Sequence, residues 1–215
     1  MSSVRLFRLS KVALLLGCLL AALSVVSKAV FFPGLDLSAG ANPLWIPLSL
    51  LFFVGASAVL LGLPGVYAPQ SAQLKTLGLL GFVLIFFWGA ASLALSTIDV
   101  FVFPFVAAHA SALGNDPPAA ILILLLVATL LSLVGFPLLG IATMRAHVVP
   151  RWTSLLLIIT PFISFLAFVP LPAPIGGIIG SGYVSLLFIG LAYFGYAHSS
   201  TQRAEPEQQV RAART

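Results

Sequence analysis

The chain has 215 residues, of which 60% are apolar and only 7% are charged. A soluble domain carries roughly 25% charged residues, because water must solvate its surface. So few charges exclude a soluble globular protein and predict a chain whose main partner is the lipid bilayer. The net charge of +5 is therefore read as a signal of membrane orientation, and no nucleic-acid partner is expected.

Six apolar segments follow one another along the chain. Each is predicted to be a helix, because an isolated strand cannot satisfy its backbone hydrogen bonds in lipid. A span needs about 20 apolar residues to cross a ~30 Å hydrocarbon core. The predicted spans are 11–32, 43–67, 75–99, 119–144, 150–169 and 175–197. We expect one all-α transmembrane helix bundle over 1–197, followed by a disordered cytoplasmic tail over 198–215.

The basic residues indicate the orientation of this bundle. With the N-terminus inside, nine of the ten lie on the cytoplasmic side, namely Arg5, Arg8, Lys11, Lys75, Arg145, Arg151, Arg203, Arg211 and Arg214. The outer half holds only Lys28, together with Asp36, Asp99 and Asp116. This distribution satisfies the positive-inside rule. Both termini are therefore predicted to be cytoplasmic, in the multi-pass topology of a bacterial inner-membrane protein.

The third segment is too long for a single span. As one helix, 76–108 would extend about 50 Å, well beyond the hydrocarbon core. Pro104 lacks a backbone N–H and is expected to kink or end the helix near Phe103. We therefore predict a span that ends at about Asp99, followed by a short apolar piece, 101–108, along the outer interface.

The N-terminal segment has three interpretations. Its basic start, apolar stretch and Ser27-Lys28-Ala29 resemble a signal peptide with a small-residue cleavage site. Leu15-Leu16-Gly17-Cys18 resembles a lipobox, in which Cys18 would be lipidated. The apolar run continues past both candidate sites, which favours a retained first span.

Lys28 and Asp99 are the only charged residues well inside apolar segments. Lys28 lies 17 residues after Lys11 and Asp99 lies 24 residues after Lys75, which is about 25 Å and about 36 Å along a helix. Both charges should therefore arrive near the outer boundary, where they could form an ion pair. The pair could line an outer cavity or relay a proton. The alternative is that each side chain reaches headgroups or water separately.

The histidines are few and scattered, so no metal site and no cofactor are expected. His109 is predicted outside, where it could join Asp99 or Asp116 in an outer binding site. A solvated loop histidine is the simpler interpretation. No HExxH motif is present, and no serine has an evident base near it in the bilayer.

The start of the sixth segment is rich in small residues. Gly176 and Gly180 form a GxxxG face, and Ser181 and Ser185 form a second small-residue pair. Such faces let helices pack closely, either within the chain or against a second subunit. The glycines do not form a phosphate-binding loop, because no Lys-Ser/Thr follows them.

Three further features are predicted to be structural. Trp45 and Trp152 fall at span ends and are expected in the aromatic belts, whereas Trp88 is expected to pack inside the bundle. Pro64 and Pro137, each two residues after a glycine, should kink their helices. The recurrence of Gly62-Leu63-Pro64 as Gly135-Phe136-Pro137 is either a two-helix repeat or chance in a chain so rich in Leu and Gly.

Two stretches carry a family resemblance. In 61–110 the motif 62–67 (GLPGVY) precedes a basic turn and a Gly-rich span that ends in 99–104 (DVFVFP), and 140–156 contains Arg145 and Pro150-Arg151-Trp152. On these residues the chain resembles small uncharacterised bacterial six-span membrane proteins, described only as domains of unknown function. The resemblance implies a multi-pass fold and carries no activity.

Three classes of function compete. A non-enzymatic membrane subunit or scaffold, acting through contacts with itself or with another membrane protein, is favoured by the small-residue faces. A small permease or a binder of lipid or small molecules would use an outer vestibule around Lys28 and Asp99. An enzyme is the last choice, because no catalytic constellation can be assembled.

Overall fold

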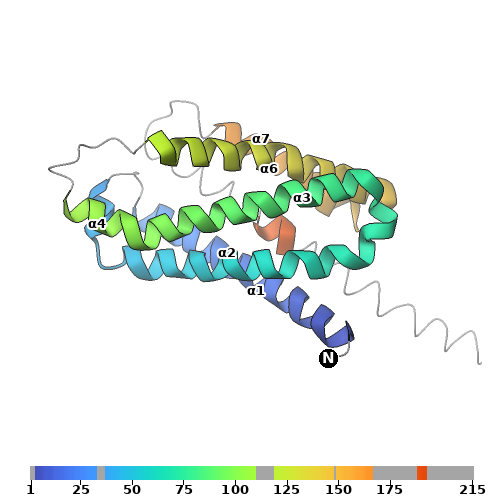
Figure 1. Cartoon of the computed structure of the whole chain (residues 1–215), viewed down its shortest axis with the longest axis horizontal. Helices are drawn as coiled ribbons and strands as arrows, with labels where there is room; N and C mark the ends of the chain where they lie inside the picture. The colour runs from blue at the N-terminus through green and yellow to red at the C-terminus, as the bar shows by residue number, and fades with distance from the viewer. Residues whose placement is uncertain (1–2, 33–36, 110–118, 148, 167–187, 193–215) are drawn as a thin grey trace, which may run out of the picture.

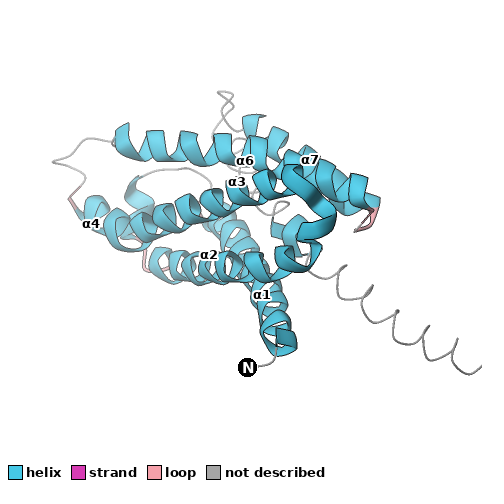
Figure 2. Cartoon of the chain, turned by 45° about the vertical axis from the view of Figure 1, so that its right-hand side comes forward, coloured by secondary structure: helices cyan, strands magenta, loops and turns pink. Residues whose placement is uncertain are grey.

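The computed structural model describes residues 3–32, 37–109, 119–147, 149–166 and 188–192. In these ranges the chain is almost wholly helical and has no strand (Figures 1 and 2). The elements are α1 (Ser3–Phe31), η1 (Leu37–Ala41), α2 (Trp45–Tyr67), η2 (Ala68–Gln70), α3 (Ser71–Thr97), the π-helical turn η3 (Ile98–Val102), α4 (Phe103–Ala108), α6 (Ala119–Ala146) and α7 (Arg151–Leu166).

Four of the described helices are long and apolar enough to cross a membrane. They correspond to the first four predicted spans and cover Arg8–Phe31, Trp45–Gly65, Ser71–Ala108 and Ala119–Ala146. The fifth predicted span is described only as far as the 16-residue helix α7. Of the sixth, only 188–192 are described, as helix. Gly176, Gly180, Ser181, Ser185 and the tail 198–215 lie outside the described residues.

The helices pack as antiparallel neighbours, backbone against backbone. Between α1 and α2 the contact passes through Gly17 and Gly55. A Cβ atom added at Gly55 would lie 2.7 Å from the nitrogen of Ala21 and 2.8 Å from the carbonyl oxygen of Gly17. Glycine is therefore required there, because lipid supplies no hydrophobic driving force and association depends on close van der Waals packing.

The same device joins α3 to α6. A Cβ at Gly81 would lie 2.6 Å from the nitrogen of Leu139, and one at Gly135 would lie 3.1 Å from the nitrogen of Ile85. Gly62 likewise faces the backbone of α1. The glycines of the two Gly-X-Pro motifs thus act as packing surfaces, and the helices continue through Pro64 and Pro137.

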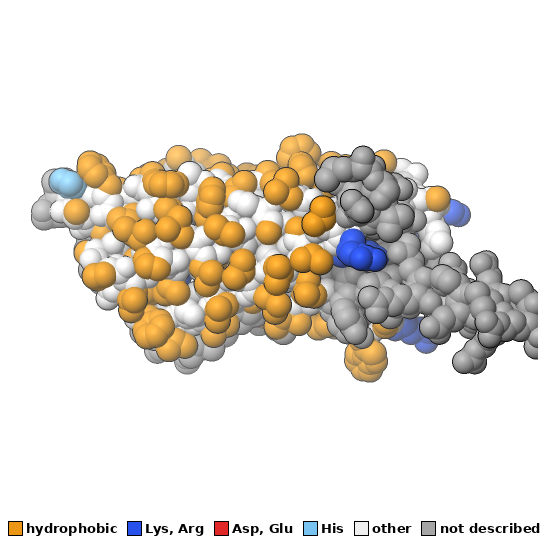
Figure 3. All heavy atoms as spheres, turned by 90° about the horizontal axis from the view of Figure 1, so that it is seen from below, with side chains coloured by type: hydrophobic (Ala, Val, Ile, Leu, Met, Phe, Trp, Pro, Cys, Tyr) orange, Lys and Arg blue, Asp and Glu red, His pale blue; other side chains and the backbone are white. Residues whose placement is uncertain are grey.

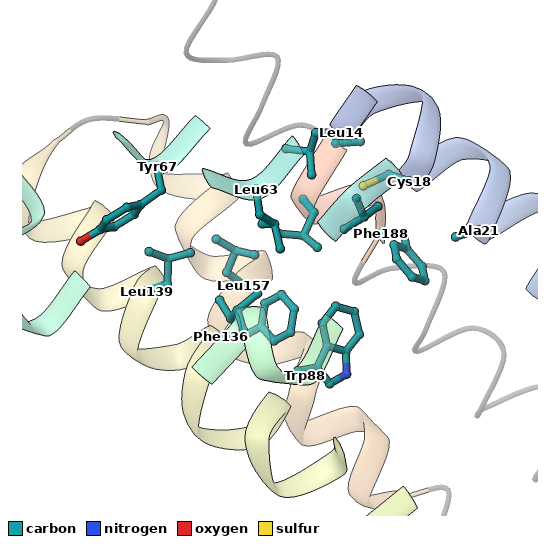
Figure 4. Packing of buried hydrophobic residues seen from close by; sticks show 14 of the residues in the cluster. Leu14, Cys18, Ala21, Leu63, Tyr67, Trp88, Phe136, Leu139, Leu157 and Phe188 are labelled. Atoms are coloured by element: carbon teal, nitrogen blue, oxygen red, sulfur yellow. The ribbon is translucent and has the colours of Figure 1, made fainter. Parts of the chain in front are cut away.

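Aromatic and branched side chains fill the space between the α1–α2 pair and the α3–α6 pair (Figure 4). Trp88 meets Phe136 edge-to-face at 5.0 Å between ring centroids and lies 5.9 Å from Phe188. Leu139 and Leu157 are fully buried beside them. Trp88 therefore packs in the core, as expected for a tryptophan in the middle of the third segment.

The outer surface is apolar along the length of the described helices (Figure 3). Large exposed side chains on α6 include Leu122, Ile123, Leu126, Leu130 and Val134. In Figure 3 the Lys and Arg side chains in view gather toward one end of the molecule. Apolar exposure of this extent is what a bundle surrounded by lipid presents.

The third segment agrees with its prediction in part. The regular α-helix α3 stops at Thr97, close to the predicted end at Asp99, but helical structure continues to Ala108, so Pro104 does not end it. The chain passes through η3, and Pro104 then falls in the first turn of α4, where a missing N–H is tolerated. A bend occurs earlier, at Lys75, which has a φ of 52° inside α3.

Candidate functional site

An ion pair joins the end of α1 to η3. Lys28 Nζ lies 2.6 Å from Asp99 Oδ2. The depth argument from the sequence brings the same two residues together. The two side chains are 17% and 39% exposed, respectively, so the pair lies at the surface of the bundle with its carboxylate turned more outward. Intramembrane charges are costly alone, and pairing offsets that cost.

Trp45 completes this cluster from the first turn of α2. Its ring centroid lies 4.2 Å from Lys28 Nζ, a cation–π distance. Phe103 stacks on the Trp45 ring at 4.8 Å between centroids, and Phe32 meets it edge-on at 5.3 Å. We call Lys28, Asp99, Trp45, Phe32 and Phe103 the ion-pair cluster. Its aromatic members hold the ammonium in place beside the carboxylate.

The position of Trp45 corrects the sequence-based expectation. It was expected in an aromatic belt, yet its side chain is only 6% exposed and lies inside the ion-pair cluster. Trp152, expected in the other belt, is 77% exposed. The difference arises because Trp45 starts α2 at the depth where α1 ends, next to a buried cation that attracts an aromatic face.

A second contact of Trp45 follows from Pro104. In η3 the Phe103 N–H donates to the carbonyl of Ile98, five residues earlier, as in a π-helix. In that register residue 104 would serve the carbonyl of Asp99, but proline has no N–H. The indole Nε1 of Trp45 donates to this oxygen instead, at 3.0 Å. Trp45 therefore supplies the hydrogen bond that the helix lacks.

The turn η1 supports the cluster from outside. Gly40 lies so close to α4 that a Cβ there would be 2.8 Å from Phe103 Cδ1 and 2.9 Å from Ala107 Cβ. The approach keeps Phe103 against Trp45. In consequence α1, η1, α2, η3 and α4 all meet around one ion pair at one end of the molecule.

His109 does not join the cluster. It follows α4, and its Nδ1 lies 2.9 Å from the carbonyl oxygen of Phe105 in its own helix. Asp116, the other proposed partner, lies outside the described residues. Within the described part of the chain, no group of three or more His, Cys, Asp or Glu side chains could hold a metal ion.

Cys18 faces the interior of the bundle. It is buried in α1, which is continuous from Ser3 to Phe31. Its thiol lines a shallow apolar groove with Leu15, Leu19 and Ala22 of α1 and with Phe188, Ile189 and Ala192. Among the described residues that line the groove, this thiol is the only polar side-chain group.

Several buried hydroxyls bond to nearby backbone or to each other, whereas those of Ser49 and Thr153 have no hydrogen-bond partner among the described residues. Ser24 Oγ donates to the carbonyl of Leu48, linking α1 to α2 at 2.6 Å. Thr143 Oγ1 lies 3.1 Å from Ser154 Oγ and links α6 to α7. These hydroxyls join helices, as expected for Ser and Thr in a membrane bundle.

The sequence argument found both charges of the cluster and missed its aromatic members. The signal was available for Trp45, because the same depth count places the start of α2 beside Lys28. It was not available for Phe103, whose direction depends on the register change in η3. Over the described residues, the fold defines an all-helical membrane protein. It has four helices of membrane-spanning length and the ion-pair cluster at one end. Comparisons with family models, curated proteins and solved structures find no match to it.

Proposed function

We propose that this chain is a multi-pass protein of a bacterial inner membrane, with six spans and both termini in the cytoplasm. The distribution of charge over the bundle supports this topology. Arg8, Lys75, Arg145 and Arg151 belong to the helix ends opposite the ion-pair cluster and are exposed. A retained first span is favoured because α1 supplies Lys28 and packs against α2.

Its function, in this proposal, is that of a non-enzymatic membrane subunit or scaffold. The observation that carries it is the exposed apolar face of α6, the least buried of the four long helices, with 22% of its most apolar window inside the molecule. That face is free of charged residues from Ala119 to Met144 and can meet another helix as readily as lipid. Several described hydroxyls and the ion pair serve contacts within the chain.

The test is photo-crosslinking from this face in native membranes. A photoreactive amino acid replaces Leu126, which is 52% exposed, and in a matched control replaces Phe136, which is fully buried. We expect Leu126 to give a protein adduct of discrete mass and Phe136 to give crosslinks within the chain only. Exclusive crosslinking of the Leu126 variant to lipid would contradict a subunit role.

A second candidate function is a small permease or a membrane protein that binds lipid or a small molecule near Lys28 and Asp99. The partial exposure of both charged side chains supports it. Native mass spectrometry of the gently extracted full chain distinguishes this function from the subunit role. A reproducible bound molecule on a monomer favours binding, and a discrete protein complex without a ligand favours the subunit role.

A further inference from the structure

The ion-pair cluster retains unused hydrogen-bonding capacity on its exposed side. Lys28 carries three N–H donors, of which one meets Asp99 Oδ2 and another side of the ammonium meets the Trp45 ring. Among the residues that the structure describes, none donates to the second carboxylate oxygen, Asp99 Oδ1. The surface therefore offers one cationic donor beside one anionic acceptor.

The chain next to the cluster is apolar rather than polar. Phe101 and Phe105, which flank Phe103 in sequence, are 65% and 64% exposed, and Phe31 and Val102 are also exposed. A site for a water-soluble zwitterion would need polar surroundings. Exposed aromatic residues at the end of a span are instead typical of the depth at which lipid headgroups meet acyl chains.

We infer that the cluster binds the headgroup of an amine-bearing phospholipid of the phosphatidylethanolamine type. The phosphate accepts a hydrogen bond from Lys28, and the primary ammonium donates to Asp99 Oδ1. The lipid chains lie along the apolar outer surface of the helices. The inference rests on the proposed membrane placement and names a ligand class for the second candidate function.

The chemistry of the pair selects among headgroups. The trimethylammonium group of phosphatidylcholine has no N–H and cannot donate to Asp99. Phosphatidylglycerol has no cation, so its negative charge would lie beside an uncompensated carboxylate. The aromatic members fix the geometry, since Trp45 contacts both Lys28 and the backbone of Asp99.

The experiment is lipid competition on the full-length protein, read by native mass spectrometry. Equimolar phosphatidylethanolamine, phosphatidylcholine and phosphatidylglycerol with identical acyl chains are offered in detergent. We expect the ethanolamine lipid to be retained about five- to tenfold over the choline lipid, in line with the net contribution of one hydrogen bond. Asp99→Asn should abolish this preference, and Lys28→Arg should preserve it.

Lys75→Gln is the matched control, because it removes an exposed lysine from the opposite end of the bundle. It should leave the preference unchanged. If Asp99→Asn fails to fold, the wild-type competition still decides, since it requires no variant. Equal retention of the three lipids by the wild-type protein overturns the inference.

Two further results would also overturn it. One is displacement of the bound lipid by millimolar phosphoethanolamine, which would indicate a soluble ligand. The other is a preference that survives in Asp99→Asn. Membrane integration is tested separately by washing the membranes with alkaline carbonate. Release of the chain by this wash would contradict the proposed membrane placement.

Discussion

The indole Nε1 of Trp45 lies 3.0 Å from the carbonyl oxygen of Asp99 and donates a hydrogen bond to it. The bond joins the first turn of α2 to the π-helical turn that follows α3. It exists because Pro104 provides no N–H in the register that would serve this oxygen. A helix defect and a side chain from another helix are thus matched to each other.

This match predicts a coupled effect of two substitutions. Trp45→Phe should destabilise the protein by about 1–2 kcal/mol, because it leaves a partly buried carbonyl without a donor. In a Pro104→Ala background the new N–H can take that role, so the same change should cost less. Unfolding by denaturing detergent, followed by circular dichroism, measures both costs. If Trp45→Phe destabilises the protein equally in both backgrounds, the indole hydrogen bond does not replace the backbone bond that Pro104 cannot donate.

The ion pair predicts a different pattern. Lys28→Gln and Asp99→Asn should each destabilise by about 1–2 kcal/mol, less than a fully buried pair because both groups are partly exposed. The double variant should lose less than the sum of the single variants. Unfolding free energies of the four proteins complete the cycle. Strict additivity would mean that the two charges act independently.

Exchanging the two charges should restore only part of the stability. In Lys28→Asp/Asp99→Lys the Coulomb attraction returns, but a carboxylate then faces the electron-rich ring of Trp45. We expect the exchanged protein to fall between the single variants and the wild type, in the same unfolding assay. A swap less stable than either single variant would contradict a pairing interaction.

The α1–α2 contact predicts a strict requirement for glycine. Gly55→Ala places a Cβ 2.7 Å from the backbone nitrogen of Ala21, so the helices must separate, at about 1–3 kcal/mol. Gly190→Ala is the control, because the added Cβ would have as its nearest described neighbours two side-chain atoms, at 3.8 and 3.9 Å. It should be neutral or slightly stabilising, since alanine favours helix. Similar melting temperatures for both variants would exclude the backbone contact.

The proposed orientation predicts which side of the membrane each end reaches. In a Cys18→Ala background, cysteine is introduced as Lys75→Cys or as His109→Cys, at two exposed positions. A membrane-impermeant maleimide added to intact spheroplasts should label the cysteine at position 109. The cysteine at position 75 should react only after permeabilisation. Labelling in the reverse order would invert the topology.

The sequence predicted the helices well and their contacts poorly. Hydrophobic length alone defines a span, and four predicted segments coincide with described helices. Depth could also be counted in residues, which is why Lys28 and Asp99 could be paired from the sequence. These quantities depend only on rise per residue and on the thickness of the bilayer.

The faces of the helices could not be predicted in the same way. A helix in lipid is apolar all round, so no stripe marks the side that packs. Small residues are the remaining signal, and they were assigned a packing role at Gly176 and Gly180, outside the described residues. Gly17, Gly55 and Gly81 make the close contacts that are described. Pro104 indicated an irregularity near Phe103, but it did not predict the π-helical turn η3, which Phe103 directly follows, or the stacking of Phe103 on Trp45.

The two partners of the ion pair are synthesised at different times. Lys28 precedes Asp99 by 71 residues along the chain. At a synthesis rate of roughly 5–20 residues per second, Asp99 is synthesised roughly 4–14 s after Lys28. During that interval α2, which bears Trp45, is synthesised before Asp99. Of the two described partners of the Lys28 ammonium, the Trp45 ring is therefore available first.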